Sequence, residues 1–326
     1  MKKILIIGSN SFSAGSFIDL LLKKKYFVIG ISRSKLNSKK FLRFDNNNQN
    51  FIFFKLDINK NQKSIISIIK KYKPAYVVNY ASQSMVGESW KDAQDWFFTN
   101  SYSMPMLYKR IYDLNIISKL IHISTPEVYG STNKKIIESN NFNPSTPYAV
   151  SRVTTDLYLK ILNEFKSFPF SSVRAANVYG EFQKLYRIIP KAVGYFLNNK
   201  KIHLDGGGLS KRSFIHIDDV SRATYLILDK GRNGETYHVS NENLISIKSL
   251  VKIIALKTNT NFNDGVIISP DRIGKDAFYN LDSSKIQKLG WNSIINLEDG
   301  IDRVISWYRK YSHKVISSDY NYKHKK

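Results

Sequence analysis

The fold is decided by the stretch Lys3-Ile4-Leu5-Ile6-Ile7-Gly8-Ser9-Asn10-Ser11-Phe12-Ser13-Ala14-Gly15. It consists of a uniformly apolar segment, a turn of small residues and the start of a helical pattern. A dinucleotide-binding turn needs small residues at three positions, for the tight turn, for the approach of a diphosphate and for helix–strand packing. Here these positions hold Gly8, Ser11 and Ala14. Because only one of the three positions is glycine, the motif alone is also compatible with an ordinary strand–helix turn. Its place at the start of alternating strands and helices favours the dinucleotide site.

Apolar segments alternate with helical patterns through the first half of the chain. The predicted strands are Lys3–Ile7, Phe27–Ile31, Phe51–Leu56, Tyr76–Asn79, Lys119–Ile123 and Ser171–Ala175. The predicted helices between them are Phe12–Lys24, Gln62–Lys71, Trp96–Leu114 and Tyr148–Phe165. Strands that alternate with helices form parallel crossover units, and strands that are apolar throughout are covered on both faces. The pattern predicts an α/β fold with a Rossmann-type, doubly wound parallel sheet.

After about Asn177 the pattern loosens, and turn residues such as Asp205-Gly206-Gly207-Gly208 appear. A strand over Ser213–Ile217 and helices near Asp219–Leu228, Ile247–Lys257 and Leu297–Tyr308 are predicted here. We therefore expect a dinucleotide-binding domain over 1–176 and a smaller, mixed α/β, mainly substrate-binding domain over 177–316, interleaved with the last sheet strands. Residues 317–326 form a polar, basic tail that we expect to fray.

Composition bounds the function. The chain has no cysteine, which excludes disulfides, thiolate ligands and a cysteine nucleophile, and no His/Asp/Glu spacing suggests a metal site. The net charge of +24 would suit a polyanionic partner, but the lysines are scattered and form no long basic block, so nucleic acid is disfavoured. A basic surface also suits a small anionic substrate. No targeting segment and no membrane-length apolar run is seen, so a soluble, cytoplasmic protein is expected.

The second predicted strand ends in Ser32-Arg33-Ser34-Lys35. An NAD site usually has an acidic residue here for the ribose 2′-hydroxyl, whereas an arginine can pair with the 2′-phosphate of NADP. The alternative is a solvated basic loop. The segment favours NADP mildly over NAD. Asp57, after the third strand, either reads an adenine amino group or only starts a turn before Asn59.

Catalytic residue types follow the fifth predicted strand. Thr125 and Glu127 come at its carboxyl end, where sites form in open α/β sheets. Tyr148 and Arg152 are four residues apart in a predicted helix and so share a face. A neighbouring cation stabilises a phenolate and lowers the pKa of the tyrosine, which would make Tyr148 a usable base.

Ordered blocks of sequence carry a family resemblance. They are Asn79-Tyr80-Ala81-Ser82-Gln83-Ser84, residues 124–130, residues 147–152, Arg174-Ala175-Ala176-Asn177-Val178-Tyr179-Gly180, residues 211–220, residues 271–276 and Leu289-Gly290-Trp291. With these blocks the chain resembles, over nearly its whole length, the extended short-chain dehydrogenases/reductases of the nucleotide-sugar epimerase/dehydratase group. The closest likeness is to dTDP-glucose 4,6-dehydratases.

The resemblance implies a reaction on a hexose attached to a nucleoside diphosphate. Tyr148 would take the proton of the 4-hydroxyl while carbon 4 gives hydride to the nicotinamide, and Thr125 would hydrogen-bond the same oxygen. Glu127 would then remove the proton on carbon 5, water would leave across carbons 5 and 6, and hydride would return to carbon 6. The product would be a 4-keto-6-deoxy sugar nucleotide, with a tightly bound NAD or NADP regenerated in each turnover.

The resemblance also implies the binding residues. Those implied for the cofactor are Gly8, Ser9, Asn10, Ser11, Phe12, Ser13, Ser32, Arg33, Asp57, Ile58, Tyr80, Ala81, Ser82, Asn100, Tyr148 and Arg152. Those implied for the substrate are Ser84, Thr125, Asn177, Arg187, Arg212 and Arg272, the arginines being suited to a diphosphate. A homodimer formed through the helices at 96–114 and 148–165 is expected as well.

Two positions depart from the family pattern. Pro126 stands where dTDP-glucose dehydratases carry the aspartate that protonates the departing hydroxyl, and Arg152 replaces the usual lysine. GDP-mannose dehydratases also have a lone glutamate here, so elimination remains possible with Glu127 in both roles. The alternatives left open are a 4-epimerase, a sugar-acid decarboxylase of the same fold, and a cofactor- or RNA-binding protein without turnover.

Overall fold

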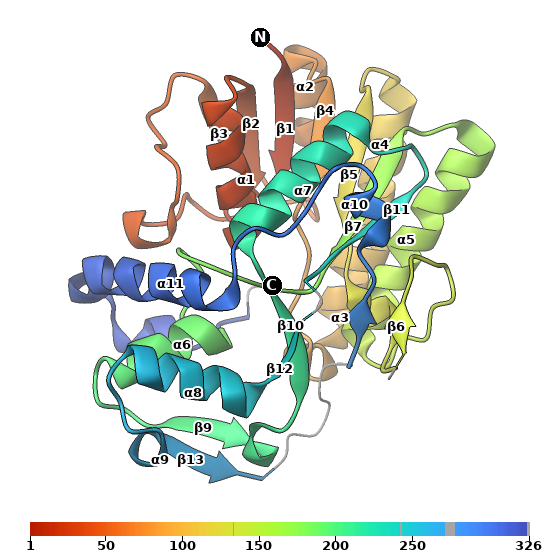
Figure 1. Ribbon diagram of the computed structural model, residues 1–326. Helices are drawn as coiled ribbons and strands as arrows, with labels where there is room; N and C mark the ends of the chain where they lie inside the picture. Colours follow the sequence, from red (N-terminus) through yellow and green to blue (C-terminus); the bar gives the residue numbers. More distant parts are fainter. Residues whose placement is uncertain (133, 242, 271–277, 325–326) are drawn as a thin grey trace.

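The computed structural model describes residues 1–132, 134–241, 243–270 and 278–324. Within these residues, seven strands form one parallel sheet in the order β11-β7-β5-β4-β1-β2-β3 (Figure 1). The strands are β1 (Lys3–Ile7), β2 (Phe27–Ser32), β3 (Phe51–Lys55), β4 (Tyr76–Asn79), β5 (Lys119–Ile123), β7 (Phe170–Ala175) and β11 (Thr236–Val239). The strand order reverses between β1 and β4, which confirms the doubly wound sheet.

Helices cover both faces of this sheet. One face carries α1 (Phe12–Lys23) and α7 (Ile217–Lys230), which pack against each other over Ile4, Ile6 and Val78. The other carries α2 (Gln62–Tyr72), α4 (Met104–Leu114) and α5 (Pro147–Lys166), over Leu5, Ile7 and Val77. Because successive side chains of a strand point to opposite faces, an unbroken apolar run such as Ile4–Ile7 supplies both cores.

The helix predicted over 96–114 is divided. It consists of α3 (Ala93–Trp96), a π-helical segment η3 (Phe97–Ser103) and α4. Thr99, a residue of this π-helical segment, lines a cavity at the carboxyl ends of the strands. The apolar pattern gave no sign of this change of pitch.

A second part of the molecule lies below the carboxyl ends of the strands in Figure 1. Its helices are α6 (Ile188–Phe196), α8 (Ile247–Lys257), α9 (Phe262–Gly265) and α11 (Leu297–Tyr311), whereas α10 (Ser284–Gln287) lies beside β11 of the main sheet. Its small sheets pair β8 (Asn177–Tyr179), β10 (Lys211–His216) and β12 (Leu244–Ser246), then β9 (Ile202–Asp205) with β13 (Val266–Ser269), and β6 (Lys135–Ile136) with β14 (Asn280–Leu281). Helices α6, α8 and α11 enclose a separate apolar core.

The C-terminal segment does not fray as expected. After α11 the chain forms two short 3-10 turns, η6 (Ser312–Lys314) and η7 (Ser317–Tyr320), and packs back onto the molecule. The Tyr320 hydroxyl hydrogen-bonds the Tyr308 hydroxyl at 2.7 Å, and its ring lies 5.1 Å from that of Tyr195. These aromatic contacts are long-range, so the polar composition of the segment did not reveal them.

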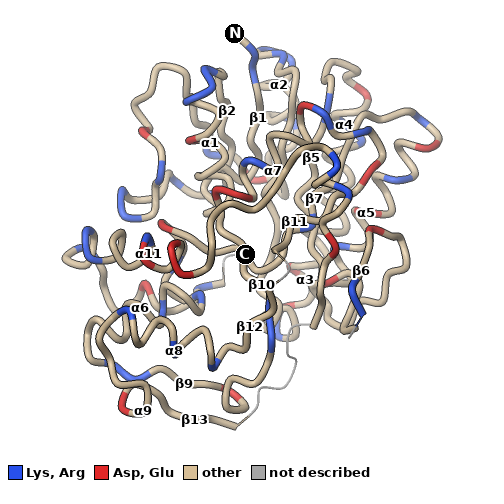
Figure 2. Tube along the Cα trace, viewed as in Figure 1, with Lys and Arg blue, Asp and Glu red and all other residues tan. Residues whose placement is uncertain are grey.

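Charged residues are distributed over both parts of the molecule, with Asp and Glu interspersed among the Lys and Arg (Figure 2). Among the described helices, none combines the length and apolarity that a membrane span requires.

Candidate active site

The turn after β1 is built around Gly8. Its φ is +80°, and a Cβ on it would lie 2.5 Å from the backbone nitrogen of Ala81, so glycine is required on both counts. The absent side chain lets β1 and β4 approach at the point where the strand order reverses. In the same turn, Ser11 caps α1 by accepting a hydrogen bond from the Ala14 N–H at 3.2 Å.

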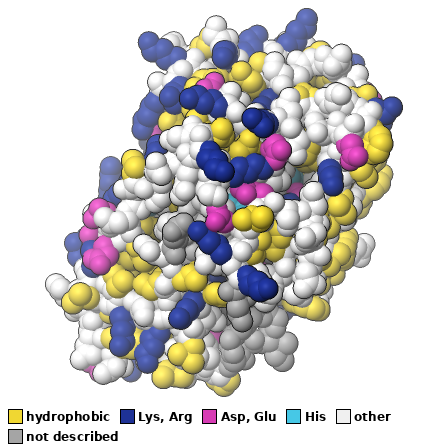
Figure 3. All heavy atoms as spheres, turned by 45° about the vertical axis from the view of Figure 1, so that its right-hand side comes forward, with side chains coloured by type: hydrophobic (Ala, Val, Ile, Leu, Met, Phe, Trp, Pro, Cys, Tyr) yellow, Lys and Arg dark blue, Asp and Glu magenta, His cyan; other side chains and the backbone are white. Residues whose placement is uncertain are grey.

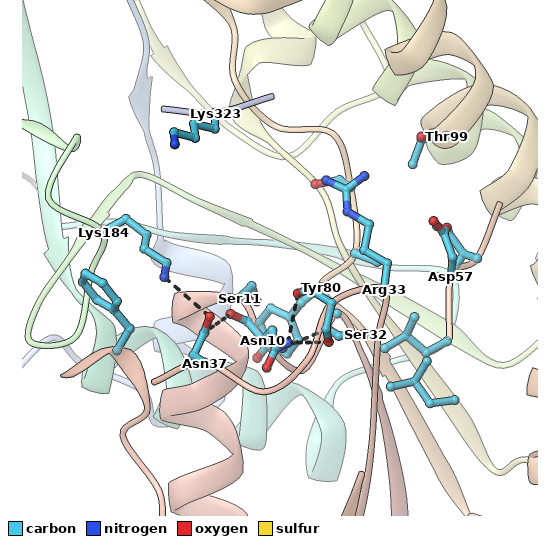
Figure 4. A pocket seen from close by; sticks show the side chains of 18 of the residues that line it. Asn10, Ser11, Ser32, Arg33, Asn37, Asp57, Tyr80, Thr99, Lys184 and Lys323 are labelled. Atoms are coloured by element: carbon cyan, nitrogen blue, oxygen red, sulfur yellow. Dashed lines mark hydrogen bonds between the residues drawn. The ribbon is translucent and has the colours of Figure 1, made fainter. Parts of the chain in front are cut away.

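A cavity of about 490 Å³ opens over this turn (Figure 4). Its walls come from the carboxyl ends of four neighbouring strands, through Ile7 and Gly8, residues 31–34, residues 56–59 and residues 80–82. Ligands of open α/β sheets bind at this position. The first turn of α1 carries no acidic residue, and its N–H groups form an anion-binding end. The residues present therefore fit a dinucleotide.

Asn10 joins the first turn to the loop after β2. Its side-chain amide donates to the carbonyl oxygens of Ser34 and Lys35 at 3.0 and 2.7 Å, and its backbone carbonyl accepts from Asn37 at 2.7 Å. The loop that carries Arg33 is thereby fixed against the phosphate end of the cavity. Figure 4 shows Arg33 and Asp57 on the same side of the cavity, with Ser11 lower down.

The catalytic residues predicted after β5 come together with Tyr148. Thr125 caps the 3-10 turn η4 (Pro126–Tyr129) by accepting from the Glu127 N–H at 3.3 Å. Tyr148 lies in the first turn of α5, whose N-cap Thr146 accepts from the Ala149 N–H at 3.1 Å. Thr125, Glu127 and Tyr148 are all buried, and the Thr125 side chain hydrogen-bonds the Tyr148 phenol.

Burial sets the acidity of Tyr148. It raises the pKa of the phenol above its ordinary value, and the Glu127 carboxylate raises it further. The guanidinium of Arg152 and the hydrogen bond with Thr125 oppose this effect, and Arg187 also lowers the pKa. The cation acts in the expected direction, but in the structure burial outweighs it.

Arg152 belongs to a polar network behind the site. Its guanidinium donates to the Ile123 carbonyl and lies 3.2 Å from His122 Nε2. His122 contacts the Tyr108 hydroxyl at 2.7 Å through its other nitrogen, and burial lowers the pKa of this histidine. Asp156 lies 3.4 Å from His122 and accepts from Arg174 at 2.8 Å. The network holds the Arg152 guanidinium where its charge lowers the pKa of Tyr148 through space.

Buried Asp156 holds a charge in this network. Burial alone would raise the pKa of this carboxyl, but Arg174, His122 and Ser124 together hold the pKa below its ordinary range. An ionised Asp156 therefore compensates the positive charge of Arg174 next to the site.

The residues implied for the substrate come from several separate elements. Arg187 is the exposed N-cap residue of α6, and Arg212 lies on β10. Asn177 is on the paired strand β8 and donates to the Ser213 carbonyl at 3.3 Å. Ser84 is exposed after β4, and Arg272 lies outside the described residues.

Ten of the residues implied for the cofactor line the cavity: Gly8, Asn10, Ser11, Ser32, Arg33, Asp57, Ile58, Tyr80, Ala81 and Ser82. Ser9, Phe12, Ser13, Asn100, Tyr148 and Arg152 do not. Asn100, for example, is fully buried and uses its side chain to hold Gln83 and Ser151, at 3.0 Å each. The roles of all these residues stay predictions.

Sequence reasoning missed several lining residues, among them Asn37, Thr99, Lys184, Tyr186, Tyr322 and Lys323. Lys184 and Tyr186 lie within the three residues before Arg187, and that position was the available signal for them. No local pattern pointed to Tyr322 and Lys323.

The fold and the site define a dinucleotide-binding α/β protein of the short-chain dehydrogenase/reductase type, in which a buried tyrosine, Tyr148, lies close to a buried glutamate, Glu127. The model of the family described as GDP-mannose 4,6 dehydratase matches residues 5–304. The chain belongs to this family, as the sequence resemblance predicted.

The most similar relatives include dTDP-D-glucose 4,6-dehydratase of Mus musculus, 31% identical over 96% of this chain and 90% of that protein. The dTDP-glucose 4,6-dehydratase of Haemophilus influenzae is 28% identical over 94% of this chain and 98% of that protein.

Among solved structures, dTDP-glucose 4,6-dehydratase of Streptomyces venezuelae with NAD bound superposes with a TM-score of 0.89. It is 26% identical, and the match covers 96% of this chain and 98% of that chain. UDP-glucose 4-epimerase of Thermotoga maritima has a TM-score of 0.87 at 25% identity, over 95% and 99% of the two chains.

Proposed function

We propose that the protein is a nucleotide-sugar 4,6-dehydratase that converts an NDP-hexose into an NDP-4-keto-6-deoxyhexose. The observation that carries the proposal is Glu127, a carboxylate only 5% exposed beside Thr125 and Tyr148. An epimerase needs a tyrosine and a hydroxyl at carbon 4 but no carboxylate for carbon 5. Relatives named dTDP-glucose 4,6-dehydratase support the same function and make dTDP-glucose the first substrate to test.

The residues divide the work between two carbons. Tyr148 removes the proton of the 4-hydroxyl, and Thr125 hydrogen-bonds that oxygen. A bound nicotinamide dinucleotide supplies the hydride acceptor for carbon 4 and the hydride donor for carbon 6. The ketone at carbon 4 acidifies the hydrogen on carbon 5, which Glu127 removes. Arg187 and Arg212 hold the substrate diphosphate.

Pro126 leaves the departing hydroxyl without the usual acid. Pro126 is buried at the first position of η4, and the next residue is Glu127. We assign both proton transfers to Glu127, which receives the proton from carbon 5 and gives it to the leaving oxygen. The second transfer restores the Glu127 carboxylate, which then takes up a proton from solvent and delivers it to carbon 5 as carbon 6 is reduced.

Substitution of Glu127 by Gln tests the function. The variant should still oxidise carbon 4, seen as reduced nicotinamide at 340 nm in a single turnover, and should lose elimination by about 10²-fold or more. Thr132→Ser, a conservative change at a residue outside the cavity lining, serves as the control. If Glu127→Gln turns over sugar nucleotide at the wild-type rate, the protein is an epimerase.

For the cofactor we propose NADP in preference to NAD, from Arg33 on the cavity wall and the absence of Asp and Glu from residues 32–37. NAD is the cofactor bound in the S. venezuelae structure. Substituting Arg33 by Ala should weaken NADP⁺ binding about tenfold and leave NAD⁺ binding nearly unchanged, since only NADP carries the 2′-phosphate. Equal effects on the two dissociation constants would contradict the preference.

We also propose a homodimer through α4 and α5. Helix α5 exposes Leu157, Ile161 and Phe165 at four-residue spacing, the last two 53% and 70% exposed. Phe98 and Tyr102 on η3 add stacked rings 5.6 Å apart. Figure 3, in which the α5 side comes forward, shows hydrophobic side chains along the right-hand part of the face. A contiguous apolar surface of this kind marks an interface.

A further inference from the structure

The cavity at the dinucleotide site has a wall that the Rossmann motifs do not supply. Residues 318, 319 and 321–323 of the C-terminal segment line it, opposite the turn after β1. Figure 4 shows Lys323 across the cavity from Ser11 and Asn10, with Lys184 on the same side of the cavity as Asn37. The segment thus closes a site that is otherwise built mainly from the first three crossover units, with Lys184 and Tyr186 added from the loop after β8.

The segment is attached at both ends of this wall. At its start, Lys40 binds Asp319 at 2.5 Å and the Lys314 carbonyl at 2.7 Å, and both side chains of the ion pair are mostly buried. At its end, the His324 ring stacks on Trp96 at 4.9 Å, and its Nε2 lies 2.6 Å from Asp95. Because Lys40 follows β2 and Asp95 lies in α3, the segment spans the mouth of the cavity between two separate parts of the nucleotide-binding half.

Between these attachments the segment presents groups suited to the ligand. The Tyr322 ring meets Tyr186 edge-on at 5.4 Å, and burial raises the pKa of Tyr322 to about 12, so it stays a neutral hydrogen-bond donor. Lys323 adds a cation, and Lys184 adds another from the loop after β8. With the N-terminus of α1 on the opposite side, the cavity presents positive charge to a diphosphate from two directions.

We propose that the C-terminal segment, residues 312–324, is a strap that retains the dinucleotide, and that Lys323 pairs with the phosphates of the dinucleotide. This inference rests on the proposed function. A 4,6-dehydratase uses the same cofactor molecule at the start and the end of each turnover, so loss of the cofactor midway would strand the intermediate. The strap supplies retention because the cofactor can leave only after the segment detaches.

Cofactor release measures the strap directly. The full-length protein is loaded with NADH or NADPH, chased with excess oxidised cofactor, and followed by fluorescence. His324→Ala, which removes the far attachment without touching the cavity lining, should release the cofactor about tenfold faster. Lys323→Gln should raise the dissociation constant and reduce its dependence on salt, because one ionic contact is lost. Lys314→Gln, an exposed lysine of the same segment outside the lining, is the matched control and should behave as the wild type.

The outcomes separate this inference from the proposed function. Release rates and salt dependence equal in all four proteins would overturn the strap while the protein remains a cofactor-binding dehydratase. A wild type that binds neither cofactor would overturn the proposed function and the strap with it. A chain ending at Asn321, which keeps Tyr320 and Asp319, gives a second measurement and should match or exceed the effect of His324→Ala.

Discussion

At the scale of the residue, Arg152 has the most informative environment. The family's lysine is replaced here by a longer side chain whose guanidinium contacts Ile123 and His122 in the polar network behind Tyr148. A charge fixed in this way acts on the phenol through space, and it opposes the effect of burial on the pKa of Tyr148. For the effect on Tyr148, the positive charge that Arg152 shares with the family's lysine therefore matters more than the different geometry of its hydrogen-bond donors.

This argument predicts the pH dependence of Arg152 variants. Tyr148 acts as a base only as phenolate, and burial raises its pKa, so kcat/KM for carbon 4 oxidation should rise with pH above neutrality. Arg152→Ala removes a cation that lowers this pKa, so the profile should shift to higher pH and the rate at pH 7 should fall about tenfold or more. Arg152→Lys should restore most of the wild-type profile. A profile for Arg152→Ala that superposes on the wild type would contradict this role.

Residue identity also sets the limits of what the sequence could predict. Gly8, Thr125, Glu127 and Tyr148 were predicted because each lies at a strand end or in the first turn of a helix, where local pattern carries the chemistry. Lys323 and His324 were not predicted as part of the site. His324 contacts Asp95, which is 229 positions away in the sequence, and no local pattern near either residue indicates this contact. Arg272, a predicted substrate ligand, lies outside the described residues.

At the scale of the element, α5 positions the base. Thr146 caps its first turn and Pro147 fixes the backbone of the next position, so Tyr148 is oriented by the helix start itself. The prediction of this helix from sequence was correct to within one residue. The π-helical turn in the helix beside it was not predicted, since a change of pitch arises from packing and leaves the apolar pattern intact.

The cap predicts a coupled effect on stability and rate. Thr146→Ala should lower the free energy of unfolding by about 1 kcal/mol and also lower kcat, because the first turn carries Tyr148. Ser246→Ala removes an equivalent cap on α8, where the Ser246 hydroxyl accepts from the Ser249 N–H at 3.0 Å, far along the chain from the site. It should cost similar stability in urea unfolding and leave kcat unchanged. Equal kcat values for the two variants would show that the first turn of α5 does not position the base.

At the scale of the whole molecule, the doubly wound sheet brings the ends of β1, β2, β4 and β5 to one edge, which carries the cavity and the residues Thr125 and Glu127. The alternation of strands and helices predicted this sheet, while the small strands of the second part were mostly missed. Those strands are two to four residues long in several cases and pair with distant segments, so no run of alternating residues marks them.

The exposed apolar face of α5 predicts a dimer of this molecule. Ile161→Glu places a charge between Leu157 and Phe165 on the exposed face of α5. It should convert the dimer into a monomer, since an unpaired charge is costly in an apolar interface. Leu256→Glu is the control: Leu256, on α8, is 78% exposed and lies outside this face, so the variant should keep the dimer's molar mass in solution. Light scattering after size exclusion distinguishes the two, and a wild type that is already monomeric at micromolar concentration would rule out the interface.

The central claim is elimination at carbons 5 and 6, and one measurement tests it most directly. The protein is incubated in D₂O with dTDP-glucose, and in parallel with UDP-, GDP- and CDP-hexoses, and the products are examined by NMR. A 4,6-dehydratase yields a 4-keto sugar with a methyl group at carbon 6 and solvent deuterium at carbon 5, because Glu127 has given its proton to the leaving oxygen and takes up a deuteron from solvent before carbon 5 is protonated. A product that keeps its 6-hydroxymethyl group, differs only at carbon 4 and carries no deuterium would contradict the account.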